Sequence, residues 1–113
     1  MNNCIFCKIA KKELPAKIRY EDEEIIAFDD TNPKAPVHIL IVPKKHIESV
    51  NTLIERDAEL IGKMVLVAQK LARQTRIDKT GYRLIINTGP NSGQIVDHIH
   101  LHLLGGQELE SMV

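Results

Sequence analysis

Hydrophobic residues recur at helical spacing over one long stretch of the chain, from about Glu55 to Gln74. The central stripe is spaced by four, three and four residues, and a second apolar row lies on nearly the same face. These positions are Leu60, Met64, Val67 and Leu71, flanked by Ile61, Val65, Ala68 and Ala72. The pattern predicts one amphipathic helix that packs on a sheet.

The other hydrophobic runs are short, which predicts strands. Two strands with a charged turn at 21–24 are expected in "AKIRYEDEEIIAFDD", and a buried strand is expected in "VHILIVP". Two more are expected in "YRLIIN" and in "HIHLHLL", which Gly105 and Gly106 close. A short helix over 4–11 and loops over 29–36 and 88–94 complete the chain. One long helix among neighbouring strands predicts an α+β fold with a five-stranded antiparallel sheet.

The last predicted strand carries three of the five histidines of the chain. Because side chains alternate along a strand, His98, His100 and His102 should share one face, while the Ile and Leu residues between them face the core. Packing does not explain three imidazoles in a row, since each buried ring nitrogen needs a partner. A histidine-rich solvent face is one interpretation, and two chemical interpretations compete with it.

The first chemical interpretation is a zinc ion held by the three imidazoles with an open position for water. The spacing spreads the rings over about 13 Å, so one strand supplies two ligands to an ion more easily than three. The second is a histidine nucleophile, because neutral imidazole attacks phosphorus and leaves readily from an N–P bond. That chemistry needs donors for the phosphate. The glycines of "GPNSGQIV" let backbone N–H groups approach an anion.

Composition narrows the classes of function. Fifteen basic and fifteen acidic residues give a net charge of zero, which offers no bulk attraction to nucleic acid or to an anionic membrane. No signal peptide or transmembrane run is apparent, so a cytoplasmic protein with a single domain, residues 1–113, is expected. In that compartment Cys4 and Cys7 are expected to be thiols or metal ligands rather than a disulfide.

The heptad "HIHLHLL" fits the pattern His-X-His-X-His-X-X, with X apolar, and so resembles the histidine-triad nucleotide-binding family. "CIFCKI", "AFDDTNPKAPVHILIVPKKHI" and "GYRLIINTGPNSGQIVDHIHLHLLGG" extend the resemblance over nearly the whole chain. The likeness is greatest to the nucleoside-phosphoramidase branch. It implies a homodimer whose sheets join across the interface. It also implies hydrolysis of purine nucleoside 5′-phosphoramidates, of AMP or GMP type, through a nucleotidyl-histidine intermediate.

The resemblance implies a role for each matching residue. His100 would be the nucleophile, His102 would bind the phosphate, and His38 would lie beside it. Further positions match those around the phosphate and leaving group, around the ribose, and in an apolar purine pocket. In that order they are Asn87, Gly93, Gln94 and Ile95; Asp30; and Ile5, Phe6, Ile9, Phe28, Asp29 and Thr31. Many members have a serine in place of Ile95, so slower turnover or an altered leaving-group preference is expected.

Cys4 and Cys7 form a C-x-x-C pair, which is half of a zinc site, with two small buried thiols as the alternative. The resemblance to members with this pair implies that His46 and His98 complete a closed, structural Zn²⁺ site. His98 would then have to leave the face that it shares with His100, for example through a bulge where the strand starts.

Four other functions remain open at this point. A dinucleoside polyphosphate hydrolase or a nucleotidyl transferase would use the same nucleophile. A nucleotide-binding scaffold would keep the nucleotide pocket but show little turnover. A zinc hydrolase with the triad as ligands would be inactivated by chelators.

Overall fold

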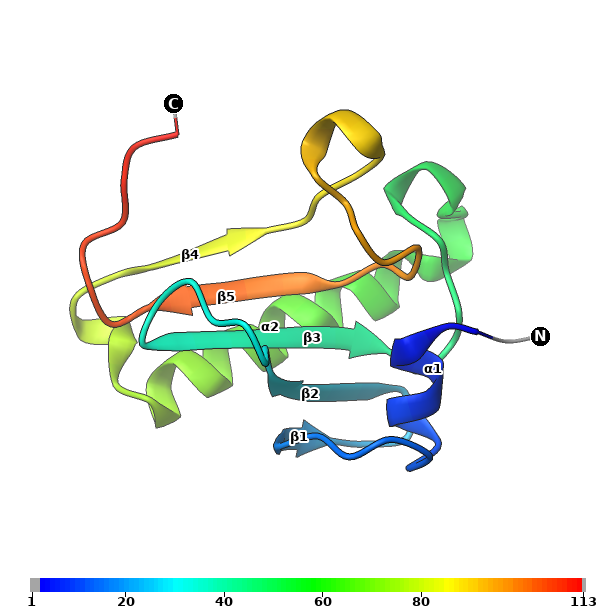
Figure 1. Ribbon diagram of the computed structural model, residues 1–113, viewed down its shortest axis with the longest axis horizontal. Coiled ribbons are helices and arrows are strands. Elements are labelled where there is room, and N and C mark those ends of the chain that lie inside the picture. Colours follow the sequence, from blue (N-terminus) through cyan, green and yellow to red (C-terminus); the bar gives the residue numbers. More distant parts are fainter. Residues whose placement is uncertain (1–2, 113) are drawn as a thin grey trace.

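The computed structural model describes residues 3–112, in which five strands form one sheet. The strands are β1 (Ile18–Glu21), β2 (Ile25–Asp29), β3 (Val37–Pro43), β4 (Tyr82–Ile85) and β5 (Leu101–Gly105). Every pairing is antiparallel, in the order β1-β2-β3-β5-β4 (Figure 1). The helices are α1 (Ile5–Ala10) and α2 (Ala58–Gln74). The predicted α+β fold is confirmed.

Helix α2 covers one face of the sheet (Figure 1). Its apolar stripe packs on side chains of β2, β3 and β5, which gives the main core. The core residues of these elements are Leu60, Met64, Val67, Ala68, Leu71 and Ala72 on α2, with Ile25, Ala27, Ile39, Ile41, Leu101 and Leu103 on the sheet. Val65 lies outside this stripe and is 43% exposed, so its predicted place on the packed face was wrong. No helix within residues 3–112 is long and apolar enough to cross a membrane.

The opposite face of the sheet carries a smaller core under α1. Phe6 and Ile9 of α1 pack with Ile26, Phe28, Leu40 and Val42. Strands β2 and β3 are therefore buried on both faces, and for this reason "VHILIVP" is an unbroken apolar run rather than an alternating one.

Strand β5 begins at Leu101, so the prediction of a strand that starts at His98 was wrong. Before Leu101 the backbone no longer pairs with β3 and β4. The N–H of Ile99 instead donates to the carbonyl of Ile47, beyond the end of β3, at 2.7 Å. Ile99 is still buried in the main core, as predicted. His98 and His100 precede the strand, and only His102 lies within it.

Gly105 belongs to β5 instead of closing it, which corrects the other end of the prediction. It pairs with Val37 of β3 and Tyr82 of β4. A Cβ atom at this position would lie 2.7 Å from Cδ1 of Ile77 and 3.3 Å from Cβ of Tyr82. A side chain here would displace the buried Ile77, which packs directly against the strand backbone, so glycine is favoured at this position. Strand β4 ends at Ile85 and leaves Asn87 in the following loop.

Candidate functional site

Two histidines reach the α1 face of the sheet from adjacent strands. His38 lies on β3 and His102 on β5, where His102 pairs with Leu40. Their positions alternate with the residues that face α2, so both side chains lie on the side of Phe28 and Leu40. His38 is 6% exposed, and His100, just before the strand, is 7% exposed. The sheet thus brings the predicted His38, His100 and His102 together at a site that is largely shielded from solvent.

The hydrogen bonds of His38 and His102 determine which ring nitrogens carry protons. The backbone N–H of Lys34 donates to Nδ1 of His38 at 3.0 Å, so the proton of neutral His38 is on Nε2. This Nε2–H donates to Nδ1 of His102 at 2.9 Å. The proton of His102 must then be on its Nε2, which is buried and has no hydrogen-bond partner within residues 3–112. A buried N–H without an acceptor indicates a place for an anion or another acceptor.

His100 has the opposite tautomer. Its Nδ1 lies 2.7 Å from the carbonyl oxygen of His98 and must donate to it, which leaves an unprotonated lone pair on Nε2. No hydrogen bond within the described part of the chain involves this Nε2. The His100 ring lies 4.9 Å from the His102 ring and 5.0 Å from the Phe6 ring, measured between centroids. A neutral imidazole with an unused lone pair beside a donor suits attack on phosphorus.

Burial keeps these imidazoles neutral. It lowers the pKa of His38 and of His100 below the ordinary value, an effect that Asp30 partly opposes. Burial, together with the neighbouring His100 and His38, lowers the pKa of His102 to about 4. At neutral pH His100 and His102 therefore hold one lone pair and one N–H ready for a ligand, and His38, His100 and His102 carry no positive charge.

Acid should destabilise the fold through the same groups. The unfolded chain protonates His102 near its ordinary pKa of 6.5, whereas the folded protein protonates it near 4. This contribution to the free energy of unfolding is complete above pH 6.5 and is lost as the pH falls toward 4, by about 1.4 kcal/mol per pH unit for one histidine. Urea unfolding between pH 7.5 and 4.5 should show a slope of at least this size, because the pKa values of His38 and His100 are lowered as well. A His102→Asn variant should show a slope that is smaller by about one proton, and an equal slope would contradict this assignment.

Asp30 directly follows β2 and lies at the edge of the triad. Its Oδ2 is 3.4 Å from Nε2 of His38, and its Oδ1 accepts the N–H of Asn32 at 2.8 Å. Its own N–H donates to the carbonyl of His38, which fixes the chain there. The predicted ribose-binding residue is thus beside the histidines.

The glycine loop is held by Gln94. Its Oε1 accepts the N–H of Gly89 at 2.8 Å, and its Nε2 donates to the carbonyls of Glu48 and Val96. The side-chain amide therefore shapes the loop, which makes Gln94 a positioning residue in this structure. Gly93 adopts a φ of 88°, Asn87 is half-buried, and Ile95 is 91% exposed.

The residues expected in the purine pocket separate into two groups. Phe6, Ile9 and Phe28 are buried together, and the edge-to-face pair of Phe6 and Phe28 has its ring centroids 5.6 Å apart. Phe6 also reaches His100, so this core continues to the triad. The other three are less enclosed: Ile5 and Thr31 are exposed, and Asp29 is held by the guanidinium of Arg19 at 2.8 and 3.0 Å.

Sequence reasoning missed the main-chain groups that set the tautomers. These are the N–H of Lys34 and the carbonyls of Pro43 and His98. It also missed Arg19. Backbone donors and acceptors have no residue-type signal, and an Arg on an edge strand is an ordinary surface residue.

A second cluster joins Cys4, Cys7, His46 and His98, whose ligand atoms all lie within 4.8 Å of one another. Nδ1 of His98 is 3.2 Å from Sγ of Cys4 and 3.6 Å from Sγ of Cys7, which is 3.3 Å from Nδ1 of His46. Nε2–H of the fully buried His98 donates to the carbonyl of Pro43 at 2.8 Å, so its Nδ1 lone pair is directed at the sulfurs. Two thiols and two imidazoles with this geometry fit a tetrahedral metal ion.

Asp30, His38 and His102 also lie close enough to hold a metal ion. The hydrogen bonds of His38 oppose metal binding at this second group of residues. Nδ1 of His38 already accepts a backbone N–H, so its Nε2 holds the ring proton and has no lone pair to offer. These hydrogen bonds therefore disfavour a metal ion on Asp30, His38 and His102. A zinc hydrolase with His98, His100 and His102 as ligands is disfavoured for another reason, because Nδ1 of His98 is directed at the sulfurs of Cys4 and Cys7.

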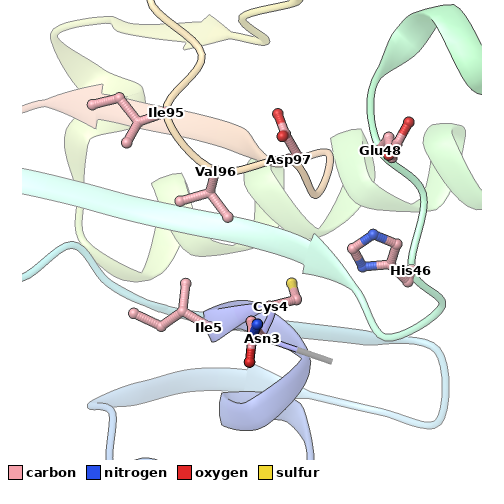
Figure 2. A pocket seen from close by; sticks show the side chains of 8 residues that line it. All are labelled: Asn3, Cys4, Ile5, His46, Glu48, Ile95, Val96 and Asp97. Carbon is pink, nitrogen blue, oxygen red and sulfur yellow. The ribbon is translucent and has the colours of Figure 1, made fainter. Parts of the chain in front are cut away.

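A cavity of about 580 Å³ lies beside the Cys-His cluster (Figure 2). Cys4 and His46 line it from one side, and the exposed loop after Gln94 lines it from the other. Its wall consists of Asn3, Cys4, Ile5, His46, Glu48, Ile95, Val96 and Asp97.

The chain is similar to known proteins over nearly its full length. Residues 3–112 match the family model described as "Scavenger mRNA decapping enzyme C-term binding". The chain is 47% identical to the purine nucleoside phosphoramidase of Escherichia coli (strain K12) over 109 residues, which cover 96% of this chain and 92% of that protein.

Solved structures show the same fold. A HIT family hydrolase from Legionella pneumophila Philadelphia 1 is 48% identical with a TM-score of 0.94, and the match covers 96% of each chain. A histidine triad protein from Clostridium difficile is 42% identical with a TM-score of 0.96, over all of this chain and 98% of that one. At such identities over nearly the full length, the protein belongs to the histidine triad (HIT) family, whose solved members include hydrolases.

Proposed function

We propose that the protein hydrolyses purine nucleoside 5′-phosphoramidates through a covalent nucleotidyl-histidine intermediate on His100. One observation carries this proposal: His100, with a lone pair on Nε2, has its ring 4.9 Å from that of His102, whose Nε2–H has no acceptor within residues 3–112. A nucleophile and a donor for phosphate oxygen are the two parts that this reaction needs. The name of the E. coli relative supports the substrate class.

In the proposed reaction Nε2 of His100 attacks the α-phosphorus, and the P–N bond breaks with its electron pair on the leaving nitrogen. That nitrogen takes a proton from solvent and departs as an amine. The carbonyl of His98 accepts the Nδ1–H of His100 and stabilises the positive charge that develops on the ring. Water then attacks phosphorus, releases the nucleoside monophosphate and returns the electron pair to Nε2. His102 donates its Nε2–H to a phosphate oxygen in both steps.

The proposal is tested by trapping. The protein, mixed with adenosine 5′-phosphoramidate and quenched in acid at short times, should gain the mass of one adenylyl group, located on His100 by peptide mapping. An adduct on another residue would contradict the proposal. Faster cleavage of a dinucleoside polyphosphate than of the phosphoramidate would favour the polyphosphate hydrolase. AMP binding without turnover of either compound would favour a scaffold.

A substitution at Ile95 tests separately whether a side-chain hydroxyl at this position assists the departing amine. An Ile95→Ser substitution exposes a hydroxyl in place of a side chain that is 91% exposed, so it leaves no cavity in the core. If a serine hydroxyl there bonds to the departing group, turnover of a phosphoramidate should rise about two- to tenfold. Single-turnover rates for alkyl and aryl amine leaving groups measure this. Ile95→Ala is the control, and equal rates for Ser and Ala would remove any role of the hydroxyl.

We further propose that Cys4, Cys7, His46 and His98 hold a structural Zn²⁺ ion. The four ligand atoms and the carbonyl of Pro43 behind His98 support it. With all four positions taken by protein ligands, such an ion cross-links the chain and activates no water. Metal analysis of protein purified without chelators should give about one zinc per chain, and a value well below one would contradict the site.

A two-fold dimer through β4 completes the proposal. Strand β4 is an edge of the sheet, and its Tyr82 and Leu84 are each 37% exposed. An open edge with apolar side chains favours strand addition by a second copy. Sedimentation equilibrium of wild type and of Leu84→Lys should show a dimer and a weakened dimer. We also propose that residues 1–113 form one domain and act in the cytoplasm.

A further inference from the structure

The Cys-His cluster and the nucleophile share one short segment of the chain. The side chain of His98 points into the cluster, while its carbonyl oxygen accepts the Nδ1–H of His100 at 2.7 Å. The same residue therefore serves as a ligand through its ring and fixes the tautomer of the nucleophile through its backbone. The ligand ring and the acceptor of His100 therefore belong to one residue.

The residue between them is tied to the cluster as well. The N–H of Ile99 donates to the carbonyl of Ile47, and Ile47 directly follows the second histidine of the cluster, His46. A backbone hydrogen bond thus ties segment 46–47 to segment 98–100, next to the two histidines of the cluster.

A third connection runs through α1. Phe6 lies between Cys4 and Cys7, and its ring contacts the ring of His98 at 5.8 Å and that of His100 at 5.0 Å between centroids. Phe6 also packs on Phe28 in the apolar core under α1. A metal ion bound to Cys4 and Cys7 would hold α1 in place. It would thereby hold the ring of Phe6 against the ring of His100.

The cluster is also open to exchange. Cys4 and His46 line the 580 Å³ cavity, and His46 is an exposed residue (Figure 2). The carboxylates of Glu48 and Asp97 line the same cavity and attract cations to it. The main core lies on the other face of the sheet, so a metal ion that reaches the cluster through this cavity does not cross it.

From these connections we infer that metal occupancy of the Cys4-Cys7-His46-His98 cluster controls the active site by positioning His100 and Phe6. The inference rests on the proposed function, because it concerns the nucleotide site of that reaction. When a thiophilic divalent cation such as Zn²⁺ is bound, His100 and the ring of Phe6 are pre-organised for a nucleotide. When the cluster is empty, both are looser and the nucleotide binds more weakly.

If zinc raises the affinity for AMP, AMP must raise the affinity for zinc by the same factor, because coupling between two binding sites is reciprocal. Both affinities are therefore measured. Calorimetric titration of AMP into chelator-stripped protein, before and after one equivalent of Zn²⁺ is restored, should show about tenfold tighter AMP binding with zinc, within the usual range of such couplings. Competition with a chromophoric chelator should then show zinc affinity raised by the same factor at saturating AMP. Thermal melts of the same samples check that the stripped protein is folded.

A single exposed ligand provides the matched variant. His46→Ala removes one cluster ligand at an exposed position and leaves the sequence of α1 and of residues 98–100 unchanged, although it also removes the contacts of His46 with Cys7 and with the ring of His98. It should reproduce the weak AMP binding of the stripped protein, and added zinc should not tighten that binding. Asn51→Ala, at an exposed position in the same segment between β3 and α2, should bind AMP and zinc as the wild type does. The imidazole ¹⁵N signals of His100 should show one tautomer with zinc and a tautomer mixture without it.

Each outcome decides the question. AMP affinity that is equal with and without zinc, or one His100 tautomer in both states, overturns the metal control and leaves the proposed function standing. AMP that fails to bind in either state overturns the proposed function itself. An AMP effect without the reciprocal zinc effect would point to a change in folding and also overturn the inference.

Discussion

A His100→Ala variant should lose phosphoramidase activity by at least about 10⁴-fold, because it removes the atom that forms the covalent bond to phosphorus. AMP affinity should change only a few-fold, since the phosphate donor on His102 and the aromatic core around Phe6 remain. Single-turnover kinetics and calorimetry on one preparation separate the two quantities. The adenylyl adduct should disappear completely.

A matched substitution at the neighbouring histidine should behave differently. His102→Asn keeps an acceptor for His38 Nε2–H but removes the donor to phosphate, so the rate should fall about 10²- to 10³-fold. The adduct should still form, slowly, on His100. A His100→Ala protein that retained more activity than His102→Asn would show that the nucleophile lies elsewhere.

Leu71→Ala should destabilise the protein by about 2–5 kcal/mol. Leu71 is 1% exposed and lies in the centre of the packed face of α2, so truncation leaves a cavity against the sheet. The measurement is the free energy of unfolding in urea, with the slope on denaturant compared to detect a change in the unfolded state.

The same helix offers a control with the same chemistry. Leu66 is 62% exposed, and Leu66→Ala should change the free energy of unfolding by no more than about 0.5 kcal/mol. Both variants gain the same helix propensity, so their difference isolates burial. Similar losses in the two variants would mean that the face around Leu66 is covered in solution, for example by a second subunit.

The sequence predicts best where one physical rule dominates. The stripe of α2 and the apolar run of β3 follow from periodicity and burial alone, and both are present close to the expected bounds. The triad shows the limit of periodicity. Alternating letters predicted one strand, yet the strand starts at Leu101, because Ile99 bonds to Ile47 and His98 turns toward the cysteines. Those partners lie about 50 and 90 positions away along the chain.

The candidate site divides in the same way. The resemblance pointed to His38, His100 and His102, and the structure brings these three side chains together. It did not reveal that Gln94 holds the loop with its side chain, or that Asp29 is bound by Arg19. These details depend on rotamers and on backbone groups, which a residue pattern does not encode.

The chain of neutral hydrogen bonds from Lys34 through His38 to His102 has a consequence for binding in salt. A site that grips phosphate with lysine or arginine weakens as ionic strength rises, because counterions screen the attraction. Here the donor is an uncharged N–H buried from solvent, and the nearby charges of Asp30 and Lys34 act on His38 in opposite directions. Affinity for a nucleoside monophosphate should therefore be nearly constant from dilute buffer to physiological salt, so the protein could bind its ligand equally well across cells of very different ionic content.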